Sequence, residues 1–182
     1  SLFIVIYLFV MQPNQVKGAS MEPTFYSGDY IFTSKVTYKI RGYNRGDVVV
    51  FKAPKNPDIE YIKRIIGLPG DKILIQSGEV YVNGRQLQEG YISAKTQTWD
   101  AGAIQEGEPL IVPNDQLFVM GDNRPRSSDS RDFGTIPMAS VIGQVIYRYF
   151  PANKMGPISN PYPSQYRSYL PTQKEVTRIA FS

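Results

Sequence analysis

The chain has 182 residues, of which 42% are hydrophobic, and its 20 basic and 16 acidic residues give a net charge of +4. This length suits one domain with a small insertion, and the hydrophobic fraction is enough for a packed core. The basic residues are scattered, with Lys63-Arg64 as the longest run, so the charge distribution predicts no nucleic-acid partner.

Two residue types are missing from the sequence, and their absence excludes several chemistries. Without cysteine there is no thiol catalysis, no disulfide and no thiolate metal site. Without histidine there is no Ser-His-Asp triad and none of the usual zinc enzymes. We therefore expect no metal, and a hydrolase built from this chain needs a carboxylate or a lysine as its base.

The first eleven residues, SLFIVIYLFVM, carry no charge, and the next charge is Lys17. A membrane-spanning helix needs about 20 apolar residues, so this segment is long enough for half a span. Because the chain begins at Ser1 without an initiator methionine, we interpret residues 1–12 as the end of a transmembrane anchor. The alternative is a buried strand, which the Ile, Val, Phe and Tyr content also favours.

After Pro13 the sequence pattern indicates a mainly β fold. Short apolar or alternating runs predict strands within residues 29–36, 46–54, 60–68, 115–123 and 141–150. Residues 79–87 predict a hairpin, because the pair Asn83-Gly84 suits a type I′ turn. Helix is limited to about one turn within residues 138–143.

Two regions differ in composition from these strands. Residues 85–112 are more polar and richer in Gly, Gln and Glu, and we interpret them as a small inserted β region. The catalytic β core is then formed by residues 13–84 and 113–150. Residues 151–182 are rich in Pro and Tyr, and we expect an extended tail on the surface.

Ser20, in the stretch KGASMEPTF at residues 17–25, is a candidate nucleophile. A lone serine near a proline is usually a turn residue, and its hydroxyl is a weak nucleophile until a base removes the proton. Lys63 in EYIKRIIGL is the best candidate base, because apolar neighbours on a strand lower a lysine pKa. Neutrality near pH 8 requires a drop of roughly 2 to 3 pKa units from about 10.4. The alternative is a lysine whose amine reaches water.

A third stretch, GDNRPRSSDSRDFG at residues 121–134, is dense in charged and polar residues. It directly follows a predicted apolar strand, and charges tethered to buried strands tend to pair. Asp122, Asp129 and Arg131 are therefore candidates for a fixed set of ion pairs around a site. The alternative is a solvated loop.

The stretches GASMEPT, YIKRIIGLPGD and GDNRPRSSDSRDFG, in this order, resemble three boxes of the type I signal peptidases. These are membrane-bound Ser-Lys endopeptidases that remove secretory signal peptides. The resemblance covers about residues 1–151 and includes the hydrophobic segment before the serine. It implies antiparallel sheets that form a signal-peptidase and LexA-like catalytic core, with a small inserted β region and part of a membrane helix in front.

The resemblance also implies roles for four residues around the chemistry. Ser20 would be the nucleophile, and Lys63 would be the general base. Ser127 would hydrogen-bond to the lysine amine and orient it, and Met21 would lie beside the catalytic centre. Because Ser-Lys acyl transfer needs no cofactor, none is expected.

Further implied roles concern ion pairs and substrate binding. Asp122 would pair with Arg64, and Asp129 with Arg131, which would hold residues 121–134 against the core. The substrate would bind as an added β-strand. The edges that match the family's substrate-binding edges consist of Gln15, Val16, Lys17 and Gly18, and of Glu60, Tyr61 and Ile62 next to Lys63.

The implied partners are signal peptides of secretory preproteins, cut after small residues at A-x-A sites, and membrane lipid. The implied location is the plasma membrane, with the catalytic domain on the extracytoplasmic side. One position departs from the family pattern. Some members use a hydroxyl residue two positions before the nucleophile as an oxyanion donor, whereas this chain has Gly18 there.

Two other functions are compatible with parts of the sequence. A LexA-type self-cleaving protein also uses a Ser-Lys pair, but it carries a DNA-binding domain and an internal cut site where this chain has an apolar segment. A membrane-anchored β-domain that binds peptides without cleaving them needs no dyad. A penicillin-binding enzyme is excluded, because no serine in the chain has a lysine three residues later.

Overall fold

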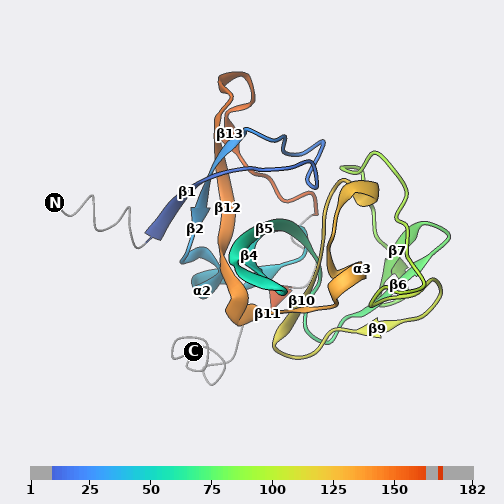
Figure 1. Cartoon of the computed structure of the whole chain (residues 1–182). Coiled ribbons are helices and arrows are strands. Elements are labelled where there is room, and N and C mark those ends of the chain that lie inside the picture. Colours follow the sequence, from blue (N-terminus) through green and yellow to red (C-terminus); the bar gives the residue numbers. More distant parts are fainter. Residues whose placement is uncertain (1–9, 163–167, 170–182) are drawn as a thin grey trace.

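The computed structural model describes residues 10–162 together with residues 168 and 169 (Figure 1). Most of the predicted membrane anchor and the last part of the predicted tail lie outside this range. Within the described residues, no helix combines the length and the apolar character that crossing a membrane requires.

The larger sheet confirms the mainly antiparallel β fold (Figure 1). Its strands follow the order β1-β2-β12-β4-β5-β10-β11, and β13 pairs with β12. All of these pairings are antiparallel. Its strands are β1 (Met11–Gln15), β2 (Tyr30–Ser34), β4 (Val48–Ala53), β5 (Asn56–Gly67), β10 (Gln116–Met120), β11 (Ile136–Pro137), β12 (Val141–Phe150) and β13 (Gly156–Pro157).

A smaller four-stranded sheet has the order β8-β7-β6-β9. Its strands are β6 (Lys72–Gln76), β7 (Glu79–Val82), β8 (Arg85–Gln86) and β9 (Leu110–Ile111). The turn between β7 and β8 has positive φ at both Asn83 (52°) and Gly84 (79°), as a type I′ turn requires.

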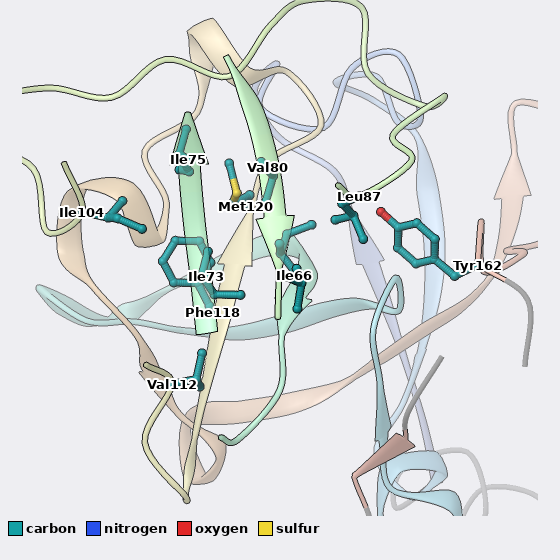
Figure 2. Close-up of a cluster of buried hydrophobic side chains, with 11 residues drawn as sticks. Ile66, Ile73, Ile75, Val80, Leu87, Ile104, Val112, Phe118, Met120 and Tyr162 are labelled. Carbon is teal, nitrogen blue, oxygen red and sulfur yellow. The ribbon is translucent and has the colours of Figure 1, made fainter. Parts of the chain in front are cut away.

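The smaller sheet starts earlier than the sequence suggested. The inserted β region was expected at residues 85–112, but β6 and β7 already belong to this sheet, and residues 87–109 contain no strand. The reason is packing: the buried faces of β6 and β7 meet the loop residues Leu87 and Ile104 in one apolar cluster with Phe118 of β10 (Figure 2). A sequence pattern alone does not show which sheet a strand joins.

Helices are short and lie between the strands. They are α2 (Thr37–Arg41), η1 (Arg124–Arg126), α3 (Ser130–Phe133), η2 (Met138–Ser140) and η3 (Ala152–Lys154). The single turn expected within residues 138–143 corresponds to η2.

The described part of the predicted tail packs against the domain. Strand β13 pairs with β12, and the two-residue strand β14 (Ser168–Tyr169) pairs with β3 (Tyr43–Asn44). Tyr162 is only 8% exposed and belongs to the apolar cluster that the smaller sheet covers. The expectation of a surface tail is therefore wrong for Tyr162.

Close packing of the central strand β12 generates a stability prediction at Gly143. A β-carbon at this position would lie 2.4 Å from the carbonyl oxygen of Ser34. We expect Gly143→Ala to lower the free energy of unfolding by roughly 1–3 kcal/mol, as overpacking usually does, in equilibrium urea unfolding. Gly156→Ala is the matched control because, apart from Gly156 itself and its two chain neighbours, no described residue has an atom within 4 Å of a β-carbon there. Equal losses in the two variants would contradict the prediction.

Candidate active site

Ser20 lies in the serine loop, residues 17–25, which follows β1. The base of this loop is closed by a main-chain hydrogen bond from Val16 N to Asp29 O at 2.8 Å. Met21, directly after the serine, is 1% exposed and packs in an apolar cluster with Val16. Burial of Met21 therefore anchors the loop next to the half-buried Ser20.

Lys63 reaches the same hydroxyl from β5. Its Nζ atom lies 2.9 Å from Ser20 Oγ and donates a hydrogen bond to the carbonyl oxygen of Ile62 at 3.0 Å. The side chain is 3% exposed, so the alternative of an amine that reaches bulk water is wrong. The structure thus joins two residues that are 43 positions apart in the sequence.

The surroundings of Lys63 favour an uncharged amine. Burial is the largest cause and lowers the pKa of Lys63 from 10.5 to about 8. The nearby carboxylates of Asp129 and Asp122 act in the opposite direction, and the Arg131 guanidinium adds to the lowering. Near neutral pH a useful fraction of the amine is therefore unprotonated and can accept a proton.

The two predicted ion pairs are formed. Arg64 binds Asp122 with two hydrogen bonds, from Nε to Oδ1 at 2.8 Å and from Nη2 to Oδ2 at 2.5 Å. Arg131 binds Asp129 in the same bidentate way, from Nε to Oδ1 at 2.8 Å and from Nη2 to Oδ2 at 2.9 Å. All four residues are buried, so each charge is compensated where it is desolvated.

These pairs fix the closing loop, residues 121–134, against the core. Asp129 Oδ2 accepts a hydrogen bond from Gly121 N at 2.9 Å. Arg131 also donates to the carbonyl oxygens of Gln97 at 2.9 Å and Arg124 at 2.7 Å. The alternative of a solvated loop is therefore wrong for this stretch.

The hydrogen bond expected between Ser127 and the lysine amine is not formed. The Ser127 hydroxyl is buried and has no hydrogen-bond partner among the described residues, while the amine contacts Ser20 and the Ile62 carbonyl instead. Ser127 is nevertheless close to the site. A β-carbon on Gly121 would lie 2.2 Å from Ser127 Oγ and 2.5 Å from Ser20 O.

Asn123 is a site residue that the sequence did not reveal. Its backbone N–H donates to Ser20 O at 3.0 Å, and its Nδ2 donates to Ala19 O at 3.0 Å. Thr24 adds a third link between the loops, from its hydroxyl to Asp122 Oδ2 at 2.5 Å. No sequence pattern signals these contacts, because an asparagine after Gly-Asp is equally typical of a simple turn.

An open cleft of about 770 Å³ lies in front of the Ser20–Lys63 pair. Within the described chain, β1 pairs only with β2, and β5 pairs only with β4 along residues 56–63. Both strands therefore present a free main-chain edge. The cleft brings together all the predicted edge residues with the pair itself, and its lining includes Gln15, Val16, Lys17, Gly18, Ser20, Glu60, Tyr61, Ile62 and Lys63.

A serine hydroxyl in contact with a buried amine of lowered pKa, at the wall of an open cleft, is the arrangement of a serine hydrolase that uses lysine as its base. The comparisons with known proteins agree with this class. The sequence profile of the family described as signal peptidase, peptidase S26, matches residues 1–150.

Individual relatives match over most of the chain. Probable signal peptidase I-2 of Synechocystis sp. (strain ATCC 27184 / PCC 6803 / Kazusa) is 39% identical over 160 residues, which cover 85% of this chain and 70% of that protein. Signal peptidase IB of Staphylococcus aureus (strain COL) is 35% identical over 173 residues, which cover 87% of this chain and 90% of that protein. A crystal structure of a signal peptidase I from Enterococcus faecalis V583 aligns with 56% of this chain and 95% of that chain, with 37% identity and a TM-score of 0.49.

The chain therefore belongs to the signal peptidase family, peptidase S26. It is a serine endopeptidase that cleaves signal peptides from preproteins, and a Ser-Lys dyad is the general mechanism of this family. The family is associated with membranes. This membership favours signal-peptide cleavage over the LexA-type and non-catalytic alternatives.

Burial of Lys63 generates a prediction about stability. Its pKa is about 8 in the folded chain, against 10.5 for an ordinary lysine, so folding below pH 8 costs about 3 kcal/mol at this group. The cost fades as the pH rises from 8 to 10.5, because the folded chain is then neutral at this group and the unfolded chain gives up its proton more easily as the pH rises. We therefore expect Lys63→Met to be more stable than the parent by up to about 3 kcal/mol at pH 6.5, and by roughly half as much at pH 9.5.

Urea unfolding at the two pH values measures this difference. Lys72→Met, at an exposed lysine of β6, is the matched control and should show no comparable gain. A Lys63→Met protein that is less stable than the parent at pH 6.5, or a gain that does not change with pH, would contradict the prediction.

Proposed function

We propose that Ser20 is the nucleophile and Lys63 the general base of this signal peptidase. The observation that carries the proposal is the 2.9 Å contact between Lys63 Nζ and Ser20 Oγ in a buried site. The neutral amine takes the hydroxyl proton while Ser20 Oγ attacks the scissile carbonyl carbon. The resulting ammonium then protonates the leaving amine, and the acyl group stays on Ser20.

The second half of the reaction uses the same lysine. Once the leaving amine has taken the proton, Lys63 is neutral again and accepts a proton from water as the water oxygen attacks the acyl carbonyl carbon. The ammonium then returns this proton to Ser20 Oγ as the bond between Oγ and the acyl carbon breaks, which restores the serine hydroxyl and the neutral amine. The Ile62 carbonyl, which accepts a hydrogen bond from Nζ, orients the amine in both steps. This sequence of steps requires no metal or cofactor.

The developing oxyanion needs hydrogen-bond donors near Ser20. The backbone N–H of Ser20 is one candidate, because it belongs to the nucleophile itself. Gly18 offers no hydroxyl for a second bond, and loss of one such donor costs about 10²–10³-fold in rate. A second donor is therefore expected from another backbone N–H or from a water molecule.

The two buried ion pairs support the site in this proposal without contacting substrate. They are formed by Arg64 with Asp122 and by Arg131 with Asp129. Their buried ion pairs hold the closing loop in contact with the serine loop through Asn123. Such rigid support matters because a displacement of about 1 Å can cost roughly 100-fold in rate.

The substrate binds as an extended strand between the edges of β1 and β5. Main-chain hydrogen bonds to residues 15–18 and 60–62 would give affinity, and pockets for alternate side chains would give specificity. Val16, Ile31 and Val50 line the cleft although each is almost fully buried, so they form a shallow apolar floor. Such a floor suits small side chains, as in the A-x-A sites that we propose as substrates.

The location proposed for the enzyme is the plasma membrane, with the catalytic domain on its extracytoplasmic side. The sequence placed the end of the anchor at residues 1–12, but Met11 and Gln12 belong to strand β1 and pair with β2, so that boundary is wrong for these two residues. Residues 1–10 would be the end of the anchor, in contact with lipid, and the support is their uncharged sequence together with the membrane association of the family. Residues 11–150 would be the catalytic domain. Nucleic acid is not a proposed partner, because the basic residues are scattered.

Removal of either member of the dyad tests the proposed roles. We expect Ser20→Ala and Lys63→Ala each to lower cleavage of a synthetic signal peptide with an A-x-A site by at least about 10³-fold, because the nucleophile and its base act as a unit. Cleavage in detergent, followed by mass spectrometry, measures this loss. Ser93→Ala and Lys72→Ala change exposed residues of the same types and should cleave normally. A Lys63→Ala enzyme with a near-normal rate would end the assignment.

The pH dependence tests the protonation state of the base. Only the neutral amine accepts the serine proton, so kcat/KM should rise with pH up to a pKa near 8 and fall about tenfold per pH unit below it. Groups near the amine include Asp129, Asp122 and Arg131, and the carboxylates are held in ion pairs. The profile is measured with the same peptide from pH 5 to pH 9. A flat profile down to pH 5 would argue against lysine as the base.

A further inference from the structure

The segment 160–162 lies beyond the region that the family profile matches, which ends at residue 150, yet its Tyr162 is buried in the interior. Tyr162 belongs to the apolar cluster between the two sheets, and Figure 2 shows its ring beside Leu87 with the hydroxyl end directed into the molecule. A segment that only trails over the surface would not bury an aromatic side chain in this way.

Asn160 attaches this segment to the turn before β4. Its Nδ2 donates to Arg45 O at 2.8 Å and to Asp47 Oδ1 at 2.9 Å, and its Oδ1 accepts a hydrogen bond from Tyr162 N at 2.8 Å. The contact is close, because a β-carbon on Gly46 would lie 2.4 Å from Asn160 Oδ1 and 2.6 Å from Tyr162 Cδ2. Only glycine, here with φ of +90°, leaves room for the segment.

The same turn holds the arginine next to the proposed base. Gly46 O accepts a hydrogen bond from Arg64 Nη1 at 2.8 Å, and Gly46 N donates to Ile65 O at 2.8 Å. Asn160 and Tyr162 therefore pack against a turn that is hydrogen-bonded to β5 at Arg64 and Ile65, the two residues that follow Lys63.

Tyr162 supports Arg64 from a second direction. Its hydroxyl lies 2.8 Å from the hydroxyl of Tyr91, and the Arg64 guanidinium lies over the Tyr91 ring, 4.3 Å from the ring centroid. Tyr91 is also bonded to Glu89 at 2.9 Å. The guanidinium is thus held at one nitrogen by Gly46, at its face by Tyr91 and along its edge by Asp122.

We propose that Asn160 and Tyr162 are positioning residues for the Ser20–Lys63 pair, acting through Arg64. The support reaches both members of the pair. Lys63 precedes Arg64 on β5, and Asp122, which Arg64 holds, precedes Asn123, whose backbone bonds Ser20 O. This inference rests on the proposed function, because it assumes that the pair is catalytic.

Acylation of Ser20 in the full chain tests this role directly. We expect Tyr162→Ala to slow the reaction of Ser20 with a penem-type acylating reagent by roughly 10- to 100-fold per folded molecule, the size of effect that small misplacements produce. The KM for an A-x-A peptide should change less than about 2-fold, because residues 160–162 do not line the cleft. Intact mass over time gives the acylation rate, and urea unfolding gives the folded fraction.

Further variants separate positioning from general stability. Tyr81→Ala removes a half-buried tyrosine from β7 of the smaller sheet and should acylate at the parental rate per folded molecule. If Tyr162→Ala does not fold, Tyr162→Leu replaces it in the test, because leucine keeps an apolar side chain in the interior. Tyr162→Leu should show the same slow acylation. Tyr162→Phe keeps the ring against Gly46 and should recover most of the rate.

Normal acylation per folded molecule in Tyr162→Ala or Tyr162→Leu would overturn the inference, even where stability falls. An equal loss of rate in Tyr81→Ala would also overturn it. The proposed function fails by a different result, namely a parental enzyme that is not acylated, or one that is acylated equally well after Ser20→Ala.

Discussion

The proposed chemistry depends on one contact, between the Lys63 amine and the Ser20 hydroxyl at 2.9 Å. A lysine works as a base near neutral pH only where its charged form is disfavoured, and here burial supplies that effect. Burial also costs stability, since the unfolded chain binds a proton that the folded chain holds weakly. The rest of the domain has to keep water out of this site and still leave one side of it open to a peptide.

Two carboxylates close to the amine could cancel the effect of burial. Asp129 and Asp122 both raise the pKa of Lys63, but each is bound in a bidentate ion pair with a buried arginine. Arg64 and Arg131 thereby compensate the negative charge while their hydrogen bonds fix the closing loop. Asn123, which lies in the closing loop, donates two hydrogen bonds to the serine loop and so fixes the position of Ser20 relative to the ion pairs. The ion pairs thus serve the electrostatics and the geometry of the site together.

Much of the fold was predictable because strand patterns are local. The runs that contain β2, β4, β10 and β12 were identified in the sequence, as were residues 60–67 of β5 and the turn at Asn83-Gly84. The division between sheets was not, because β6 and β7 join the smaller sheet through packing with Leu87 and Ile104. The tail was misjudged for a related reason. Its composition resembles that of a surface segment, yet Tyr162 is buried. The burial is possible because Gly46, far earlier in the chain, has no side chain and leaves room for the tyrosine ring.

The sequence by itself determined the available chemistry. Without histidine or cysteine, a serine hydrolase must use lysine or a carboxylate as its base, and the three boxes pointed to Ser20, Lys63 and the two ion pairs. Only the tertiary structure decided which atoms contact the amine. The Lys63 amine donates a hydrogen bond to the Ile62 carbonyl and none to the Ser127 hydroxyl. Asn123 lies next to the serine loop and is hydrogen-bonded to it. Residue types limit which reactions are possible, whereas hydrogen bonds between segments distant in sequence depend on how the whole chain packs.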